Sequence, residues 1–118
     1  MTPQTDLDGR VCIVTGGGRG LGAEAAKGLA AAGATVVVND LGTDLAGEGE
    51  DPGPAEDVAA AIREAGGAAT AHVGDVAELD YAASLVGDAV DAHGRLDRVA
   101  NFAGFLRDGY ATNLSADD

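Results

Sequence analysis

The stretch TGGGRGLG, from Thr15 to Gly22, places glycines and one arginine directly after a short apolar run. Gly16 ends that run and lets the chain turn, and Gly20 lets a bound group approach the backbone closely. Gly22 lets the helix that follows pack tightly on a sheet. The start of that helix offers free N–H groups and the positive end of its dipole, which attract anions. The stretch therefore predicts a diphosphate-binding turn.

A second candidate for chemistry is Asp40, which closes the apolar run TVVVND eighteen residues after Gly22. A carboxylate at the end of a second strand accepts hydrogen bonds from the two ribose hydroxyls of an adenosine. Taken alone, Asp40 fits a solvated carboxylate or a partner of a helix dipole equally well. Together with the glycines it favours ribose binding. A nucleoside triphosphate (Walker) loop does not fit, because the chain's one lysine, Lys27, lies outside the glycine-rich stretch.

Apolar and alanine-rich stretches alternate along the chain, which is the pattern of strands and helices in turn. The expected elements are strands over 10–15, 35–40 and 68–73 and one centred on Val99 and Ala100, with helices over 21–32, from Pro54 to Gly66 and from 82 to Gly94. This order predicts an α/β, Rossmann-type three-layer fold with a parallel, doubly wound sheet of strand order 3-2-1-4. Its ligand crevice lies between the carboxyl ends of the first and fourth strands, where the glycine-rich stretch stands.

Length and charge narrow the classes of partner. The 118 residues are the length of one domain, and 20 acidic against 7 basic residues give a formal charge of -13. Such a charge repels phosphate backbones and anionic lipids, so neither nucleic acid nor a membrane is expected as a partner. The N-terminal residues show no basic segment followed by an apolar one, and no run of about eighteen apolar residues occurs, so a cytoplasmic protein is expected.

No metal or redox site is expected. Cys12 is the one cysteine and lies in an apolar run, where core packing is favoured over a redox role. His72 and His93 lack a third ligand at suitable spacing, so packing or helix-dipole roles are favoured. The acidic residues between 41 and 53 do not have the spacing of a calcium-binding loop and indicate a solvated loop.

The spacing Thr-Gly-x-x-x-Gly-x-Gly over 15–22 resembles the signature of the short-chain dehydrogenase/reductase family. Two further stretches, GDV at 74–76 and NFAG at 101–104, resemble family motifs that follow the third and fourth strands. The resemblance implies that an aspartate and an apolar neighbour flank the adenine, and that an Asn-Asn-Ala-Gly segment braces the sheet and lines the cofactor cleft; Phe102 stands in place of the second Asn. The cofactor-binding residues predicted in this way are Gly16, Arg19, Gly20, Leu21, Gly22, Asp40, Asp75, Val76, Asn101, Ala103 and Gly104.

Charge decides which nicotinamide cofactor is expected. Asp40 would face the 2′-phosphate of NADP as a like charge, whereas it bonds the free ribose hydroxyl of NAD well. Arg19 argues the other way, because many NADP-using relatives have a basic residue there; a solvated side chain over the diphosphate is the favoured alternative. No Lys or Arg occurs between Lys27 and Arg63 to hold an extra phosphate. NAD is therefore expected, and NADP is less favoured.

The catalytic residues of the family do not occur as a set in this chain. The resemblance implies a Tyr that exchanges the hydroxyl proton, a Lys four residues later, and a Ser and an Asn that position the substrate. Tyr81 is followed at that spacing by Leu85, and Tyr110 by Leu114. We therefore expect residues 1–118 to be an NAD-binding half-domain that ends before the catalytic region, with no catalytic residue of its own.

The acidic insertion and the stretches around it look most like the subgroup that contains the (3R)-hydroxyacyl-CoA dehydrogenase domain of multifunctional β-oxidation enzymes. Two functions stay open. The first is the cofactor-binding part of an NAD-dependent oxidoreductase that acts on a secondary alcohol or ketone and is inactive as this chain alone. The second is a non-catalytic module that binds NAD or an adenine nucleotide. The family resemblance also implies that the full-length form is a homo-oligomer.

Overall fold

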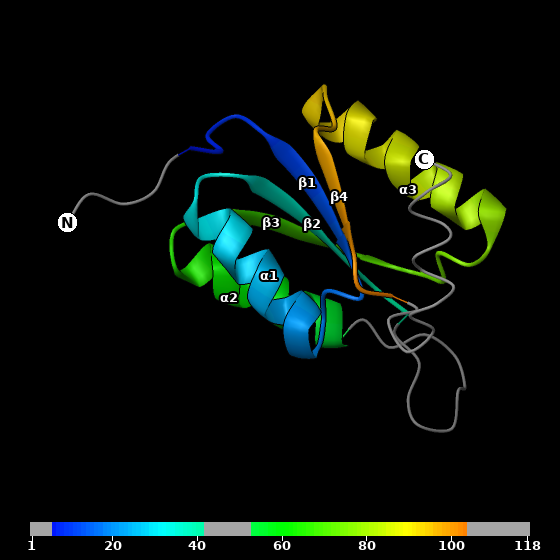
Figure 1. Cartoon of the computed structure of the whole chain (residues 1–118), viewed down its shortest axis with the longest axis horizontal. Helices are drawn as coiled ribbons and strands as arrows, with labels where there is room; N and C mark the ends of the chain where they lie inside the picture. Colours follow the sequence, from blue (N-terminus) through cyan, green and yellow to red (C-terminus); the bar gives the residue numbers. More distant parts are fainter. Residues whose placement is uncertain (1–5, 42–52, 104–118) are drawn as a thin grey trace.

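The computed structural model describes residues 6–41 and 53–103, which alternate strictly between strands and helices (Figure 1). The elements are β1 (Val11–Thr15), α1 (Gly20–Ala31), β2 (Thr35–Asp40), α2 (Gly53–Glu64), β3 (Ala68–Val73), α3 (Leu79–His93) and β4 (Arg98–Asn101). The predicted alternation is confirmed. α3 begins at Leu79, about one turn before the start at residue 82 that the apolar pattern predicts. The pattern misses this turn because Leu79 is exposed and Asp80 is acidic, so neither residue continues the buried apolar stripe.

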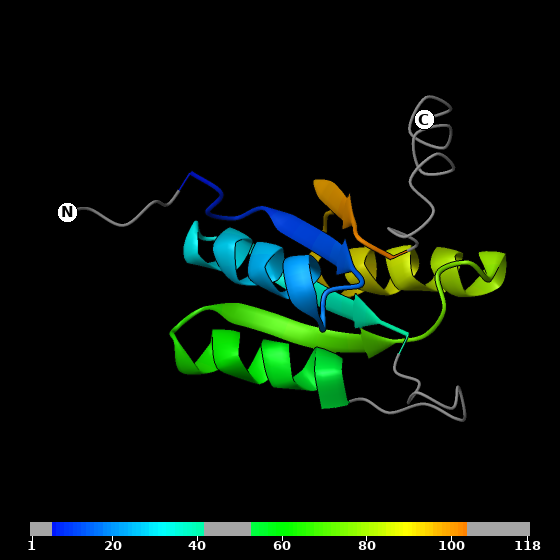
Figure 2. The same cartoon turned by 60° about the horizontal axis from the view of Figure 1, so that its bottom comes forward.

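The strands form one parallel sheet of order β3-β2-β1-β4, as the sequence predicts. α1 and α2 lie on one face of this sheet and α3 lies on the other, which gives three layers (Figures 1 and 2). The carboxyl ends of β1 and β4 are paired through Thr15 and Asn101, and those of β2 and β3 through Asp40 and Val73. All the strand ends that carry predicted site residues therefore meet at one edge of the sheet.

β1 is the centre of the core, since all five of its residues are buried. Cys12 and Val14 pack toward α1 and α2, and Ile13 packs toward α3, as expected for side chains that alternate between the faces of a strand. Cys12 is fully buried, which agrees with its predicted packing role, and burial raises the pKa of its thiol.

The start of β1 is tied to the segment that leads into β4 by the carboxylate of Asp97. One oxygen accepts the Val11 N–H at 2.8 Å and the Arg95 Nε–H at 2.9 Å, and Arg10 lies 3.6 Å from the other. The Arg95 hydrogen bonds, the Val11 amide and the charge of Arg10 lower the pKa of Asp97 to about 2. These contacts fix how β4 lies against β1.

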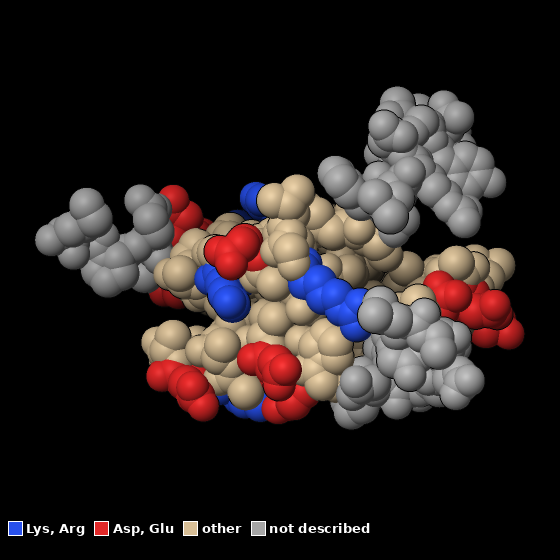
Figure 3. All heavy atoms as spheres, turned by 90° about the horizontal axis from the view of Figure 1, so that it is seen from below, with Lys and Arg blue, Asp and Glu red and all other residues tan. Residues whose placement is uncertain are grey.

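Among the residues that the structure describes, no helix is both long enough and apolar enough to cross a bilayer. Figure 3 views the face that α1 and α2 cover. Acidic side chains are spread around this face, and the basic ones stand at separate places rather than in one broad patch.

Candidate cofactor-binding site

The glycine-rich turn between β1 and α1 adopts a backbone path that other residues would not fit. Gly16 has φ +67°, and a Cβ added to it would lie 2.8 Å from the Ala103 nitrogen. A Cβ on Gly22 would overlap the carbonyl oxygen of Gly16. Gly22 therefore lets the first turn of α1 contact the backbone of the glycine-rich turn. From the sequence, Gly22 is expected to allow close packing of the helix on the sheet, and the observed close contact is with the turn.

Gly20 differs from these two because, among the described residues, no atom beyond its chain neighbours and its own helix backbone lies within 4 Å of the position a Cβ would take. Its φ is +54°, so the backbone conformation favours glycine although the space beside it is open. An open backbone at the first residue of α1 is what a closely approaching ligand requires.

Gly17 and Gly18, to which the sequence pattern gave no role, tie the turn to β2. The Gly17 N–H donates to the Asn39 carbonyl oxygen at 2.7 Å, and the Gly18 N–H donates to Oδ2 of Asp40 at 2.9 Å. A Cβ on Gly18 would lie 2.8 Å from that same carboxylate oxygen. The run of three glycines is the sequence signal for this close approach, and it positions the Asp40 carboxylate against the turn.

The N-terminus of α1 is electrostatically distinct from those of the other described helices. Arg19 is its N-cap residue in extended conformation, no side chain caps it, and no acidic residue stands in its first turn. α2 and α3 instead carry Glu56 and Asp80 in their first turns, where a carboxylate compensates the positive end of the dipole. Of the three described helices, α1 is therefore the one whose N-terminus is suited to an external anion.

A cleft of about 340 Å³ opens between this helix N-terminus and the ends of β2 and β4. Its lining residues are Gly16, Arg19, Leu21, Gly22, Asp40 and Phe102. Asp40 is only 7% exposed, so its carboxylate forms part of the cleft wall rather than a solvated strand end. The structure thus brings five predicted site residues together and adds Phe102, whose ring also packs against the core under α1 and α2.

Thr15 organises the segment after β4. Its Oγ1 donates to Oδ1 of Asn101 at 2.6 Å and accepts the Ala103 N–H at 3.4 Å, and its carbonyl oxygen accepts the Phe102 N–H at 2.9 Å. Asn101 and Ala103 therefore stand beside β1 without lining the cleft, and Gly104 lies outside the described residues. The sequence pattern contains Thr15 but does not reveal this bracing role, which depends on the register of β1 with β4.

Asp75 and Val76 form the turn that follows β3. The exposed Asp75 accepts the Ala77 N–H on Oδ1 at 2.9 Å, and Val76 packs against the core cluster under α3. Neither residue lines the cleft beside Arg19, although Gly74 before them donates its N–H to the Asp40 carbonyl oxygen at 3.0 Å. The structure therefore places this turn next to Asp40 but outside that cleft.

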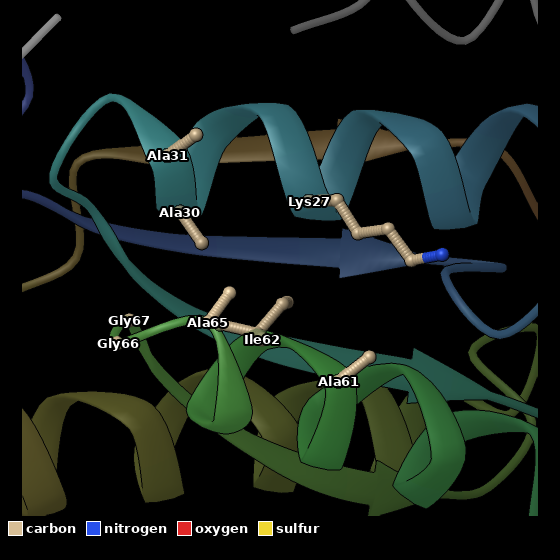
Figure 4. A pocket seen from close by; sticks show the side chains of 8 residues that line it. All are labelled: Lys27, Ala30, Ala31, Ala61, Ile62, Ala65, Gly66 and Gly67. Atoms are coloured by element: carbon tan, nitrogen blue, oxygen red, sulfur yellow. The ribbon is translucent and has the colours of Figure 1, made fainter. Parts of the chain in front are cut away.

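A second hollow, of about 370 Å³, separates α1 from α2 (Figure 4). Small side chains such as Ala30 and Ala61 line it, with Lys27 at one side. It lies at the C-terminal ends of both helices, which is the end of the molecule opposite the glycine-rich turn because each helix runs antiparallel to its strands. None of the predicted site residues that the structure describes contributes to it.

The comparisons with known proteins agree with this arrangement. Residues 10–118 match the family model of the short chain dehydrogenases. The chain belongs to this family. Over 112 residues it is 45% identical to peroxisomal multifunctional enzyme type 2 of Mus musculus, covering 95% of this chain and 15% of that protein. It is also 41% identical to the hydroxyacyl-CoA dehydrogenase ChsB1 of Mycobacterium tuberculosis, covering 99% of this chain and 35% of that one. The chain therefore spans about a third of the second relative and a smaller share of the first.

Solved structures of the family share the fold. A short chain dehydrogenase from Mycobacterium avium is 46% identical, with a TM-score of 0.73 over 80% of this chain and 33% of that one. A metagenomic short-chain oxidoreductase in complex with NADP is 34% identical, with a TM-score of 0.67 over 79% of this chain and 38% of that one. The expected family and its Rossmann-type fold are confirmed, and the family binds NAD or NADP.

Proposed function

We propose that this chain binds NAD in the cleft beside α1, with the diphosphate at the helix N-terminus and the adenosine ribose on the Asp40 carboxylate. The adenine lies toward the turn formed by Asp75 and Val76. The observation that carries this proposal is that the uncapped start of α1 and the Asp40 carboxylate line one cleft. A bound anion would there meet free N–H groups and a positive dipole end.

The choice of NAD over NADP rests on the fixed place of Asp40. Because the Gly18 N–H holds its carboxylate in the cleft wall, a 2′-phosphate on the ribose would stand close to a negative charge. Arg19 lines the same cleft and would favour the 2′-phosphate of NADP. A related short-chain oxidoreductase was solved in complex with NADP, so NADP is the alternative cofactor to weigh. The largely buried Asp40 is expected to outweigh the exposed Arg19, since solvent screens the arginine more strongly.

We infer further that the whole protein interconverts a secondary alcohol and a ketone, with a 3-hydroxyacyl-CoA as substrate class. The relative named hydroxyacyl-CoA dehydrogenase supports this substrate class. NAD supplies hydride transfer when bound. Of the two tyrosines, Tyr81 has its hydroxyl within hydrogen-bond distance of Asn39 and His72, and Tyr110 lies outside the described residues. The cytoplasmic location and the homo-oligomeric full-length form stay predictions.

Calorimetry with the 118-residue chain tests the proposal. NAD is expected to bind, and Asp40→Ala is expected to weaken binding about 10-fold or more, because hydrogen bonds to a charged group are lost. Glu24→Ala, an exposed position on α1, is the matched control and should leave the affinity unchanged. No NAD binding by the unmodified chain would contradict the proposed function, and equal affinities for the chain and Asp40→Ala would contradict the ribose role.

The same preparation tests the division between binding and chemistry. We expect no NADH to form from NAD and a 3-hydroxyacyl-CoA, because the residue four positions after Tyr81 is Leu85 and the one four positions after Tyr110 is Leu114, where the family has a lysine. Turnover by the purified chain would overturn this expectation. Binding without turnover would also fit a non-catalytic module, and restoring activity by adding the C-terminal part of a relative would decide for the enzyme.

A further inference from the structure

We propose that Asn39 and Tyr81 are positioning residues that hold the turn at Gly74–Val76 in place and thereby set the preference for adenine as the bound base. This inference rests on the proposed NAD site. It concerns a polar cluster of Asn39, His72 and Tyr81 at the ends of β2 and β3, in which the sequence pattern gave Asn39 no role.

Asn39 is the centre of the cluster. It is only 1% exposed, and its backbone carbonyl accepts the Gly17 N–H from the glycine-rich turn. Its side-chain Nδ2 lies 3.0 Å from the His72 carbonyl oxygen, 3.3 Å from that of Gly74 and 3.0 Å from the Tyr81 hydroxyl. One buried residue therefore bonds the turn before α1, the end of β3 and the first turn of α3.

Tyr81, in the first turn of α3, contacts the turn at Gly74–Val76 through its ring. Its ring lies so close to Gly74 that a Cβ there would overlap the ring. The Gly74 N–H is bonded to the Asp40 carbonyl oxygen, and its carbonyl is within reach of the Asn39 amide. Gly74 is thus held through its N–H and by the Tyr81 ring beside its Cα, and Asp75 follows it directly.

The cluster continues from Tyr81 to the surface through His72. The Tyr81 hydroxyl lies 2.6 Å from Nδ1 of His72, and Nε2 lies 2.8 Å from Oδ2 of Asp88 on α3. One consistent arrangement has Asn39 donating to Tyr81, Tyr81 donating to Nδ1, and the Nε2–H donating to Asp88. The expected packing or helix-dipole role of His72 is therefore incomplete, because the side chain orients the Tyr81 hydroxyl.

Packing alone does not call for an amide at position 39. Val37, the neighbour of Asn39 on the same face of β2, is buried and apolar, and burying an amide is favourable only when its hydrogen bonds are made. Among the described residues, every buried side-chain nitrogen and oxygen has a partner. The directional bonds of Asn39 therefore select one orientation of the turn, which an apolar side chain would not do.

The orientation of the turn matters because Asp75 presents a carboxylate. A carboxylate accepts a hydrogen bond from the amino group of adenine and repels the carbonyl oxygen that hypoxanthine carries at the same ring position. The ratio of affinities for NAD and for nicotinamide hypoxanthine dinucleotide therefore reports the place of Asp75. General loss of stability would weaken both ligands alike and leave the ratio unchanged.

The experiment measures this ratio by calorimetry on the 118-residue chain and its variants. The unmodified chain is expected to prefer NAD about 2- to 10-fold, the range of one net hydrogen bond. Asn39→Ala should bring the ratio close to 1. Tyr81→Leu, which removes both the ring and the hydroxyl, should lower the ratio more than Tyr81→Phe, which keeps the ring against Gly74. The two Tyr81 variants decide the question if Asn39→Ala does not fold.

Arg63→Met is the matched structural control. Arg63 donates to the Ala69 carbonyl oxygen at 2.9 Å, near the start of β3 and at the opposite end of the strand from Gly74. The Arg63→Met chain is expected to be less stable but to keep the same ratio of affinities. An unchanged ratio in the Tyr81 variants, or no preference for NAD in the unmodified chain, overturns this inference while the proposed function stands. If the unmodified chain binds neither dinucleotide, the proposed function itself has failed.

Discussion

The two faces of the sheet differ in how completely they are covered. On the face of α1 and α2, the apolar stripe of α2 is buried throughout, from Ala55 to Ile62. On the face of α3, only Leu85 and Ala89 of the helix are buried, while Val86 and Val90 are 42% and 40% exposed. β4, at the edge of the described sheet, likewise leaves Val99 53% exposed. The cleft lies mainly against the well-packed half, since Gly22 and Asp40 belong to α1 and β2 and Phe102 packs against the core under α1 and α2.

The sharpest contrast between the faces is expected from Ile62→Ala and Leu85→Ala, since each side chain is 3% exposed. Truncation in a dense core leaves a cavity and costs about 2–5 kcal/mol. Ile62→Ala should fall in the upper half of that range, because Ile62 belongs to the larger of the two clusters of buried side chains, the one under α1 and α2. Leu85→Ala should fall in the lower half, because its half-exposed neighbours can close around the gap. Urea unfolding of both variants measures the difference, and a larger loss for Leu85→Ala would reverse the comparison.

Within the well-packed half, two glycines of α1 should respond in opposite ways to alanine. Gly22→Ala forces a Cβ onto the Gly16 carbonyl and should destabilise the chain by about 1–3 kcal/mol, with loss of NAD binding. A Cβ at Gly28 would meet none of the surrounding atoms, so Gly28→Ala should stabilise the chain by about 0.5–1 kcal/mol. Unfolding curves and NAD titrations of the two variants provide the check. Equal effects would show that the turn before α1 is not held closed by Gly22.

Much of this half could be predicted from the sequence. Buried apolar strands alternating with alanine-rich helices fix the strand order through the rule of right-handed crossovers. The glycine spacing and Asp40 then place the cleft, because the ends of parallel strands share one edge. These signals are local patterns or general rules of topology, and such patterns can be read from residue types alone.

The hydrogen bonds that organise the site could not be predicted in the same way. Asn39 meets the Tyr81 hydroxyl because β2 and β3 pair with Asn39 opposite His72, a register that no residue type reveals. Thr15 braces Asn101 for a similar reason. Val76, which the sequence places beside the adenine, packs against the core under α3, and its contact with a ligand stays a prediction. Side-chain direction at strand ends depends on such details of pairing.

The smallest effect on stability is expected from changes at Asp97, the residue that ties the segment before β4 to the start of β1. Its pKa, lowered to about 2, lies below the value of about 3.9 of an unfolded aspartate, so its bonds favour the folded chain above about pH 4 and are lost as the pH falls toward 2. The effect is modest because Arg95 and Arg10 are about half exposed. The stability difference between the unmodified chain and Asp97→Asn should therefore shrink between about pH 4 and 2, as urea unfolding at stepped pH would show. Arg95→Met should reduce the same acid dependence, because it removes the largest cause of the lowered pKa. A difference that stays constant across this pH range would mean that the carboxylate charge of Asp97 does not hold β4 against β1.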